Sequence, residues 1–138
     1  MLVAYTVALD LVRSLRTVVA ELRKYSADSA DQVERAASSI VLNIAEGERR
    51  SGRDPQRFYS IASGSAGEIL GALDLADAWG WKIESSEARA LLDREQRLLR
   101  GLTRRSPSKT ARLSHRRIDE CPPREAFTDS SHRDRLTR

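Results

Sequence analysis

Hydrophobic residues recur at spacings of three and four along most of the first hundred positions, a pattern typical of amphipathic α-helices. One such segment covers residues 3–25, and a second covers residues 32–48. The sequence SADSAD between them offers Ser29 and Asp31 as N-caps for the second helix. No segment shows the alternation expected of a half-buried strand. The pattern therefore favours an all-α protein.

A third helix is predicted to start at Asp54, where an N-cap acid precedes a proline, and to stop at Gly80. Trp79 and Trp81 flank that glycine, and we expect them to close the end of a helical bundle. The apolar face of this helix is predicted to contain Phe58, Ile61, Ala62, Ser65, Ile69, Leu73, Ala76 and Trp79.

A fourth helix is expected over residues 87–105, with Ser85 or Ser86 as its cap and Glu95 among the residues of its apolar face. Because the connections are short, neighbouring helices must run antiparallel. Residues 1–105 are thus predicted to form an antiparallel up-and-down four-helix bundle. Residues 106–138 change to Ser, Arg, Pro and Asp with few large apolar residues, and we expect a disordered basic tail.

The charge of the chain is distributed unevenly. Residues 1–102 carry 14 basic and 15 acidic side chains, a net of −1, whereas residues 103–138 carry 10 basic and 5 acidic, a net of +5. Aromatic residues make up only 5% of the chain, so the core must be mainly aliphatic. No apolar run is long enough to cross a bilayer, and the first residues do not resemble a signal peptide.

The residue types exclude several kinds of site. Cys121 is the single cysteine, which rules out an internal disulfide and favours a cytoplasmic protein. His115 and His132 show no metal-ligand spacing with it, so zinc is not expected. The helical segments contain no histidine, and no nucleophile–base pair can be assembled from them. We expect no catalytic residues, no metal and no cofactor.

Three polar residues interrupt the second helix: Ser39, Asn43 and Glu46 share one edge beside the apolar face. Glu46 could act as a general base or metal ligand, but a second titratable group would be needed. The alternative, which we favour, is a hydrogen-bonded seam in which Asn43 bridges to a neighbouring helix or subunit.

The third helix contains three glycines, Gly64, Gly67 and Gly71, within SIASGSAGEILGAL. Each costs about 1 kcal/mol relative to alanine in a helix interior, which suggests compensation by the close approach of another backbone. The pattern does not match a nucleotide-binding loop, since no strand precedes the glycines. The close contact could lie within the bundle or between subunits.

Two sets of cations are candidates for contact with nucleic acid. One lies at the connection of the second and third helices and comprises Arg49, Arg50, Arg53 and Arg57. The other lies at and beyond the end of the fourth helix and comprises Arg104, Arg105, Lys109, Arg112, Arg116 and Arg117. A solvated loop would explain the first set equally simply, whereas repetition around a ring of subunits would add many weak phosphate contacts.

One motif identifies a family resemblance. The run Asn43-Ile44-Ala45-Glu46-Gly47, followed after the basic loop by Arg57-Phe58 and Gly64-Ser65, resembles the bacterial "four helix bundle protein" family. This family includes proteins encoded in intervening sequences of 23S ribosomal RNA genes. The resemblance covers residues 1–105 in architecture and about 35–80 in motif.

The resemblance implies an antiparallel bundle that assembles into a homopentamer and has no catalytic activity. A related protein, the accessory variability determinant of diversity-generating retroelements, is similar in fold and binds nucleic acid and a reverse transcriptase. Two hypotheses therefore stand: an oligomeric accessory protein that binds RNA, DNA or a nucleoprotein partner, and a purely structural or protein-binding oligomer. Asn43, Glu46, Gly47 and the three glycines of the third helix would then serve packing and assembly.

Overall fold

The computed structural model describes residues 1–52 and 54–104, and its first two helices are separated by a single residue. Helix α1 (Val3–Tyr25) ends at Ser26, and helix α2 (Ala27–Arg49) begins directly after it. The hydroxyl of Ser26 accepts a hydrogen bond of 3.2 Å from the backbone N–H of Ser29. The prediction that α2 begins near residue 32 is therefore wrong. Ser26 caps the helix, and α2 begins at Ala27, five residues before the predicted start.

Helix α3 (Asp54–Ala78) begins at the predicted Asp-Pro pair and ends two residues before Gly80. The N–H of Trp81 donates to the carbonyl of Ala76 at 2.9 Å, and the N–H of Gly80 donates to that of Asp77 at 3.0 Å. Gly80 has a φ of +75°. This is the Schellman arrangement, in which a glycine takes the left-handed conformation that other residues adopt only with strain.

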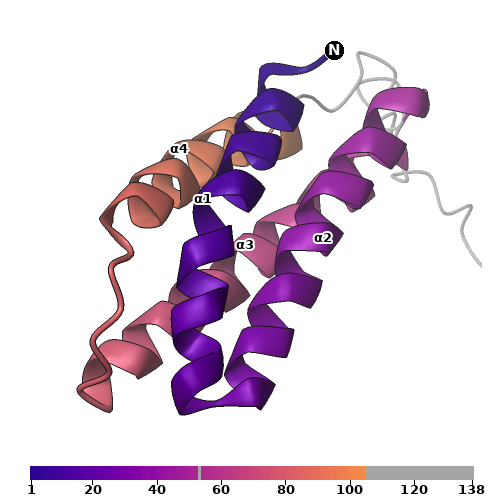
Figure 1. Ribbon diagram of the computed structural model, residues 1–138. Helices are drawn as coiled ribbons and strands as arrows, with labels where there is room; N and C mark the ends of the chain where they lie inside the picture. The colour runs from indigo at the N-terminus through magenta and orange to yellow at the C-terminus, as the bar shows by residue number, and fades with distance from the viewer. Residues whose placement is uncertain (53, 105–138) are drawn as a thin grey trace, which may run out of the picture. The chain divides into compact units, whose positions relative to one another are not determined.

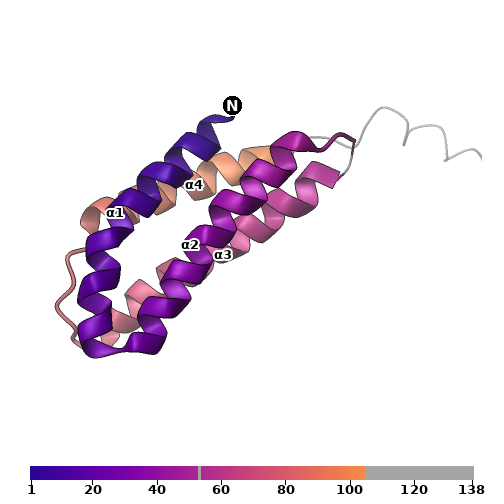
Figure 2. The same cartoon turned by 45° about the vertical axis from the view of Figure 1, so that its right-hand side comes forward.

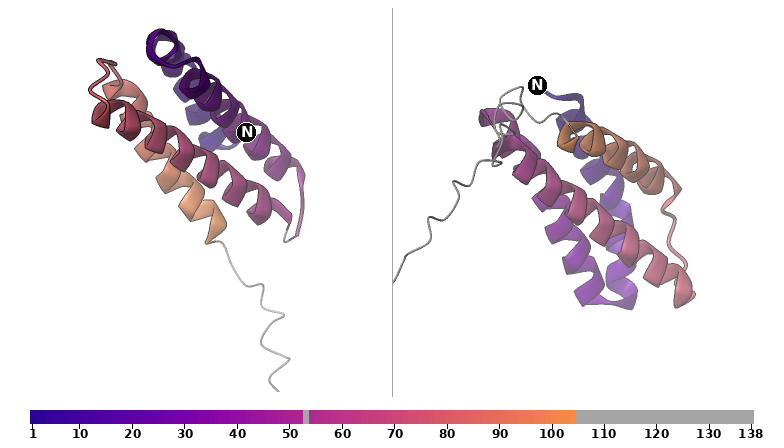
Figure 3. Two further views of the ribbon diagram at one scale, coloured as in Figure 1. Left: turned by 90° about the horizontal axis from the view of Figure 1, so that it is seen from below. Right: turned by 180° about the vertical axis from the view of Figure 1, so that it is seen from behind.

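Helix α4 (Ser86–Thr103) completes an all-α, up-and-down four-helix bundle, as predicted (Figure 1). Helix α1 packs against α2 and α4, and α3 packs against the same two helices. Figure 2 shows α2 and α3 running side by side, and Figure 3 shows α3 and α4 from below and from behind. Among the described residues, no helix has both the length and the apolar character needed to cross a membrane. The predicted tail, residues 106–138, lies outside the described residues.

The core of the bundle is aliphatic, as expected from the composition. Its largest fully buried apolar side chains are Leu11, Leu15, Val18, Leu22, Val33, Ile40, Ile44, Ile69, Leu73, Leu92 and Leu99. Tyr59 is the one buried aromatic residue among those described.

The predicted apolar face of α3 is wrong at both ends. At the start of the helix Tyr59 is buried, whereas Phe58 is half-buried and Ile61 is 42% exposed. At the other end Trp79 is 69% exposed and does not close the bundle. Trp81 does contribute there, because its ring stacks on that of Tyr25 with centroids 5.4 Å apart.

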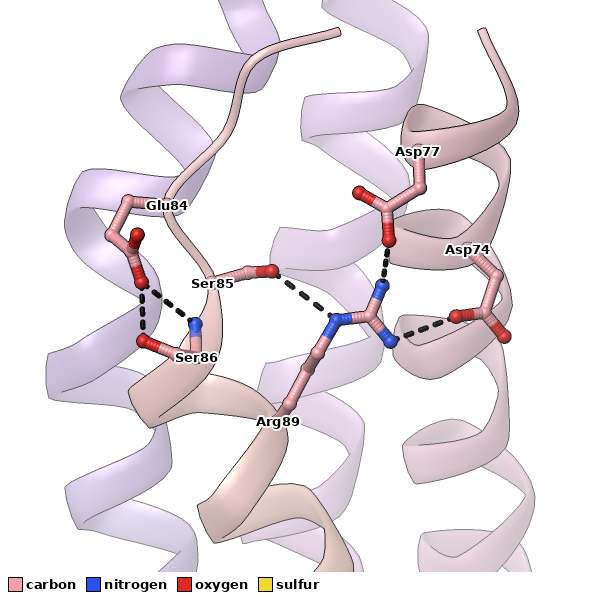
Figure 4. Close-up of polar contacts among 6 residues, drawn as sticks. All are labelled: Asp74, Asp77, Glu84, Ser85, Ser86 and Arg89. Carbon is pink, nitrogen blue, oxygen red and sulfur yellow. Dashed lines mark hydrogen bonds and ion pairs between the residues drawn. The ribbon is translucent and has the colours of Figure 1, made fainter. Parts of the chain in front are cut away.

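Arg89 joins the start of α4 to the end of α3 (Figure 4). Its guanidinium contacts a carboxylate oxygen of Asp74 at 2.8 Å and one of Asp77 at 2.6 Å. Its Nε also donates to the hydroxyl of Ser85, the N-cap residue, at 3.3 Å. One planar guanidinium thus bonds three groups and links the start of α4 to the end of α3.

Candidate nucleic-acid interface

The up-and-down topology brings four chain segments to one end of the bundle. The N-terminal amine lies 3.1 Å from a carboxylate oxygen of Glu48 at the end of α2. Gly47, also near the end of α2, packs under the ring of Tyr59 near the start of α3. Residues 2–4 at the start of α1 share a hollow with residues 97–102 at the end of α4. The end of α2, the start of α3 and the end of α4 accordingly lie together (Figure 3).

Of the arginines predicted near the α2–α3 connection, Arg49 and Arg57 are exposed and have no ion-pair partner among the described residues. Arg50 is instead held in place. Its guanidinium lies 2.6 Å from Glu46, 3.7 Å from Asp54 and 5.5 Å above the ring centroid of Phe58. Arg50 therefore connects α2 to α3 and is less available for contact than its neighbours.

The end of α4 carries a row of arginines that the sequence interpretation did not recognise as a row. Arg97, Arg100 and Arg104 follow one another at spacings of three and four, so they share one face of the helix. Arg97 pairs with Asp93 at 2.9 Å, whereas Arg100 and Arg104 have no ion-pair partner in the described part of the chain. Only Arg104 of these was predicted, because the apolar face of α4 was traced and its polar face was not.

The remaining predicted cations lie outside the described residues: Arg53, Arg105, Lys109, Arg112, Arg116 and Arg117.

We define the basic end of the bundle as Arg49, Arg57, Arg97, Arg100 and Arg104. The carboxylates in the last turns of α2 and the first turn of α3 are Glu46, Glu48 and Asp54, and each already contacts Arg50 or the N-terminal amine.

The opposite end is richer in acids. Asp31 and Glu34 at the start of α2 both contact Arg23 at the end of α1, at 2.9 and 3.2 Å. Other carboxylates in the helix ends and connections there belong to Glu21, Asp28, Asp74, Asp77, Glu84 and Glu87. Two hydrogen bonds from Ser86, one from its hydroxyl and one from its backbone N–H, lower the pKa of Glu84 (Figure 4). A body with almost no net charge is thus polarised along its length.

The polar residues inside α2 form a partial seam. The amide of Asn43 donates to the carbonyl of Ser39 at 2.8 Å and to its hydroxyl at 3.1 Å. The hydroxyl of Ser65 on α3 donates to that of Ser39 at 2.8 Å. Ser39, rather than Asn43, therefore bridges to the neighbouring helix within one chain. Glu46 lies outside this seam and pairs with Arg50.

Gly47 occupies a position that only glycine fits without rearrangement. A Cβ placed there would lie 2.7 Å from the ring of Tyr59, whose side chain is almost fully buried. Burial, followed by the nearby charge of Glu48, raises the pKa of the Tyr59 phenol. The contact shows close packing of α2 on α3 at this point.

The three glycines of α3 behave differently. A Cβ at Gly64, Gly67 or Gly71 would meet nothing within 4 Å, and all three are exposed. The expectation of a close contact within the bundle is therefore wrong, while a contact between subunits remains a prediction. Near these glycines, large apolar side chains are also exposed: Leu42 at 67%, Ile61 at 42% and Leu75 at 52%. We call these six residues the glycine face.

Glu95 is a buried group whose significance the sequence interpretation missed. It was expected on the apolar face of α4, and its side chain is indeed fully buried, yet neither carboxylate oxygen has a hydrogen-bond partner among the described residues. Burial raises the pKa of Glu95 to about 8, and the nearby charge of Arg94 opposes this effect. No group of three or more potential metal ligands occurs within residues 1–52 and 54–104.

Comparison with known proteins decides the family. The family model described as "23S rRNA-intervening sequence protein" matches residues 1–104, which is the whole bundle. The chain belongs to this family. A search of curated proteins found no match.

Membership of the 23S rRNA-intervening sequence protein family confirms the resemblance deduced from the Asn43–Gly47 motif. The match ends at Arg104, together with the described part of α4, so both the α2–α3 arginines and the α4 row lie within the family region.

Proposed function

We propose that this 23S rRNA-intervening sequence protein is a non-enzymatic, homo-oligomeric accessory protein that binds nucleic acid, alone or with a protein partner, through its basic end. The observation that carries the proposal is the separation of charge along the bundle. Arg49, Arg57, Arg100 and Arg104 have no ion-pair partner among the described residues, and the nearby carboxylates are already engaged. Arginines without an ion-pair partner can bind phosphate groups, whose geometry and charge they match.

Repetition of the basic end around an oligomer would strengthen binding, since weak phosphate contacts on linked subunits add up. The composition supports a non-enzymatic role, because both histidines and the single cysteine lie beyond residue 104. That lone cysteine also supports a cytoplasmic location as part of the proposal.

The test compares two triple variants of the full chain. The first, Arg49→Gln, Arg57→Gln and Arg104→Gln, removes three cations from the basic end. The control, Arg16→Gln, Arg35→Gln and Lys82→Gln, removes three exposed cations from elsewhere, so the net charge changes equally. Fluorescence anisotropy with labelled RNA and DNA at several salt concentrations gives the affinity and its salt dependence.

We expect the basic-end variant to bind about tenfold or more weakly than the parent, with a salt slope that is shallower by about 2 to 3. The control should stay close to the parent. Equal losses in both variants would mean that only net charge matters, and binding that no substitution affects would assign affinity to residues 105–138. Either result contradicts the proposal.

A second candidate is an assembly protein without affinity for nucleic acid, and the glycine face favours it. Three glycines and three large apolar side chains exposed on α2 and α3 form a surface typical of helix–helix contact between subunits. The affinity of the parent protein for labelled RNA and DNA, measured in the same anisotropy experiment, decides between the two candidate functions. Absence of binding at low salt by an oligomeric protein would leave assembly as the function.

A further inference from the structure

Two hollows adjoin each other at the basic end. The first, about 370 Å³, lies between the start of α1 and the end of α4, and its walls are mainly apolar. They include Leu2, Val3, Leu98 and Leu102. Val3 is 57% exposed, so an apolar surface is open to solvent there.

The second hollow, about 300 Å³, is lined by the three arginines of the α4 row and by Gly101. Arg97, which pairs with Asp93, and Gly101 line both hollows. Within residues 1–52 and 54–104, no acidic residue lines either hollow. A Cβ at Gly101 would meet nothing within 4 Å, so the space at this shared residue is open. Apolar and cationic surfaces therefore meet at this glycine.

A ligand that fits both hollows must be apolar on one side and anionic on the other. Arg49 and Arg57 lie at the same end of the bundle, which favours an anion with several charges over a small molecule with one charged group. A nucleic-acid strand has both properties, since its bases are flat and apolar on their faces and its phosphates are evenly spaced. Guanidinium planes also stack on bases, and an arginine beside an apolar wall is suited to that contact.

We infer that the joined hollows hold an unstacked base together with its flanking phosphates, so that the basic end prefers single-stranded nucleic acid to a duplex. In a duplex the faces of the bases are covered by their neighbours, and only the phosphates could reach the arginines. This inference rests on the proposed function and names the ligand class of the same site.

The test fills the open space at Gly101 and leaves every charge in place. Gly101→Leu puts a bulky side chain between the hollows, and Gly101→Ala is the matched control with a small one. Both exchange a helical glycine for a better helix former, so neither is expected to unfold the bundle. Each full-length variant is titrated against four labelled probes of equal length: single-stranded RNA, single-stranded DNA, a DNA duplex and a single strand of abasic sites.

For the parent protein, we expect the single strands with bases to bind at least fivefold more tightly than the abasic strand and the duplex. Gly101→Leu should remove that preference without changing the affinity for the duplex, and Gly101→Ala should keep it. RNA and DNA strands that differ by less than twofold would show recognition of bases and phosphates alone, as inferred.

Two results would overturn the inference while leaving the proposed function intact. One is equal binding of strand, abasic strand and duplex, each weakening with salt. The other is a preference for single strands that Gly101→Leu does not alter. A competition experiment covers a protein partner. If a short peptide of leucine and glutamate displaces the labelled strand at a lower concentration than unlabelled strand does, the hollows bind a protein partner instead. Absence of binding to every probe would contradict the proposed function itself.

Discussion

Two polar sites inside the bundle are accommodated in opposite ways. Ser39, Asn43 and Ser65 satisfy one another through hydrogen bonds of 2.8 to 3.1 Å, so their partial burial costs little. Glu95 is fully buried and has no such partners in the part of the chain that the structure describes. A buried carboxyl without partners avoids the larger cost of an isolated charge by staying protonated.

The pH dependence of stability follows from Glu95. Its pKa is raised from 4.5 to about 8 in the folded protein, so the folded state holds a proton that the unfolded state releases. The free energy of unfolding should therefore fall as the pH rises from about 4.5 to about 8, with this residue contributing up to about 1.4 kcal/mol per pH unit.

Urea unfolding at several pH values checks this prediction, with Glu95→Gln as the control that keeps the shape and removes the titration. The variant should show a flatter profile than the parent between pH 5 and 8. Glu95→Leu should be the most stable of the three at pH 8. Parent and Glu95→Gln profiles that run parallel would show that Glu95 does not titrate across this range.

At the scale of elements, the periodicity predicted all four helices, and α1 and α3 closely match their expected bounds. The start of α2 was not predictable from local signals alone, because SADSAD contains several residues that can cap a helix. Only the fold shows that Ser26 is the N-cap. The face of α3 was misjudged for a similar reason. Phe58 and Tyr59 are adjacent, and burial of the tyrosine depends on its contact with Gly47 in another helix.

The glycine face, whose three glycines lie on α3, leads to a prediction about assembly. Because a side chain at Gly64 or Gly67 would meet nothing within one chain, Gly64→Leu with Gly67→Leu should leave the helices intact. We expect the double variant to lose its oligomeric mass in sedimentation or light scattering. The parent should have about five times the chain mass of 15.5 kDa, the number that the family resemblance implies.

Gly101→Leu is the matched control for the double variant, since it adds the same side chain to a helix outside the glycine face. It should retain the mass of the parent. An unchanged mass in the double variant would mean that the glycines are tolerated in α3 without serving assembly.

For the whole molecule, the arrangement of charge matters more than its sum. A count along the sequence gives residues 1–102 a net charge of −1, which suggests that this region has no affinity for nucleic acid. The alternating direction of the helices then places Arg49 and Arg57 at the same end as the α4 row, while many of the acids gather at the other end. No one-dimensional count could show this, because it depends on which helix ends meet.

Footprinting of arginine side chains is the most direct measurement of the central claim. The intact protein is treated with phenylglyoxal with and without bound nucleic acid, and the modified residues are identified by mass spectrometry. Arg16 and Arg35, exposed on α1 and α2 away from the basic end, are the internal controls. Protection of Arg49, Arg57, Arg97, Arg100 and Arg104, with both controls still reactive, is the predicted result. Uniform protection, or protection confined to residues 105–138, would contradict it.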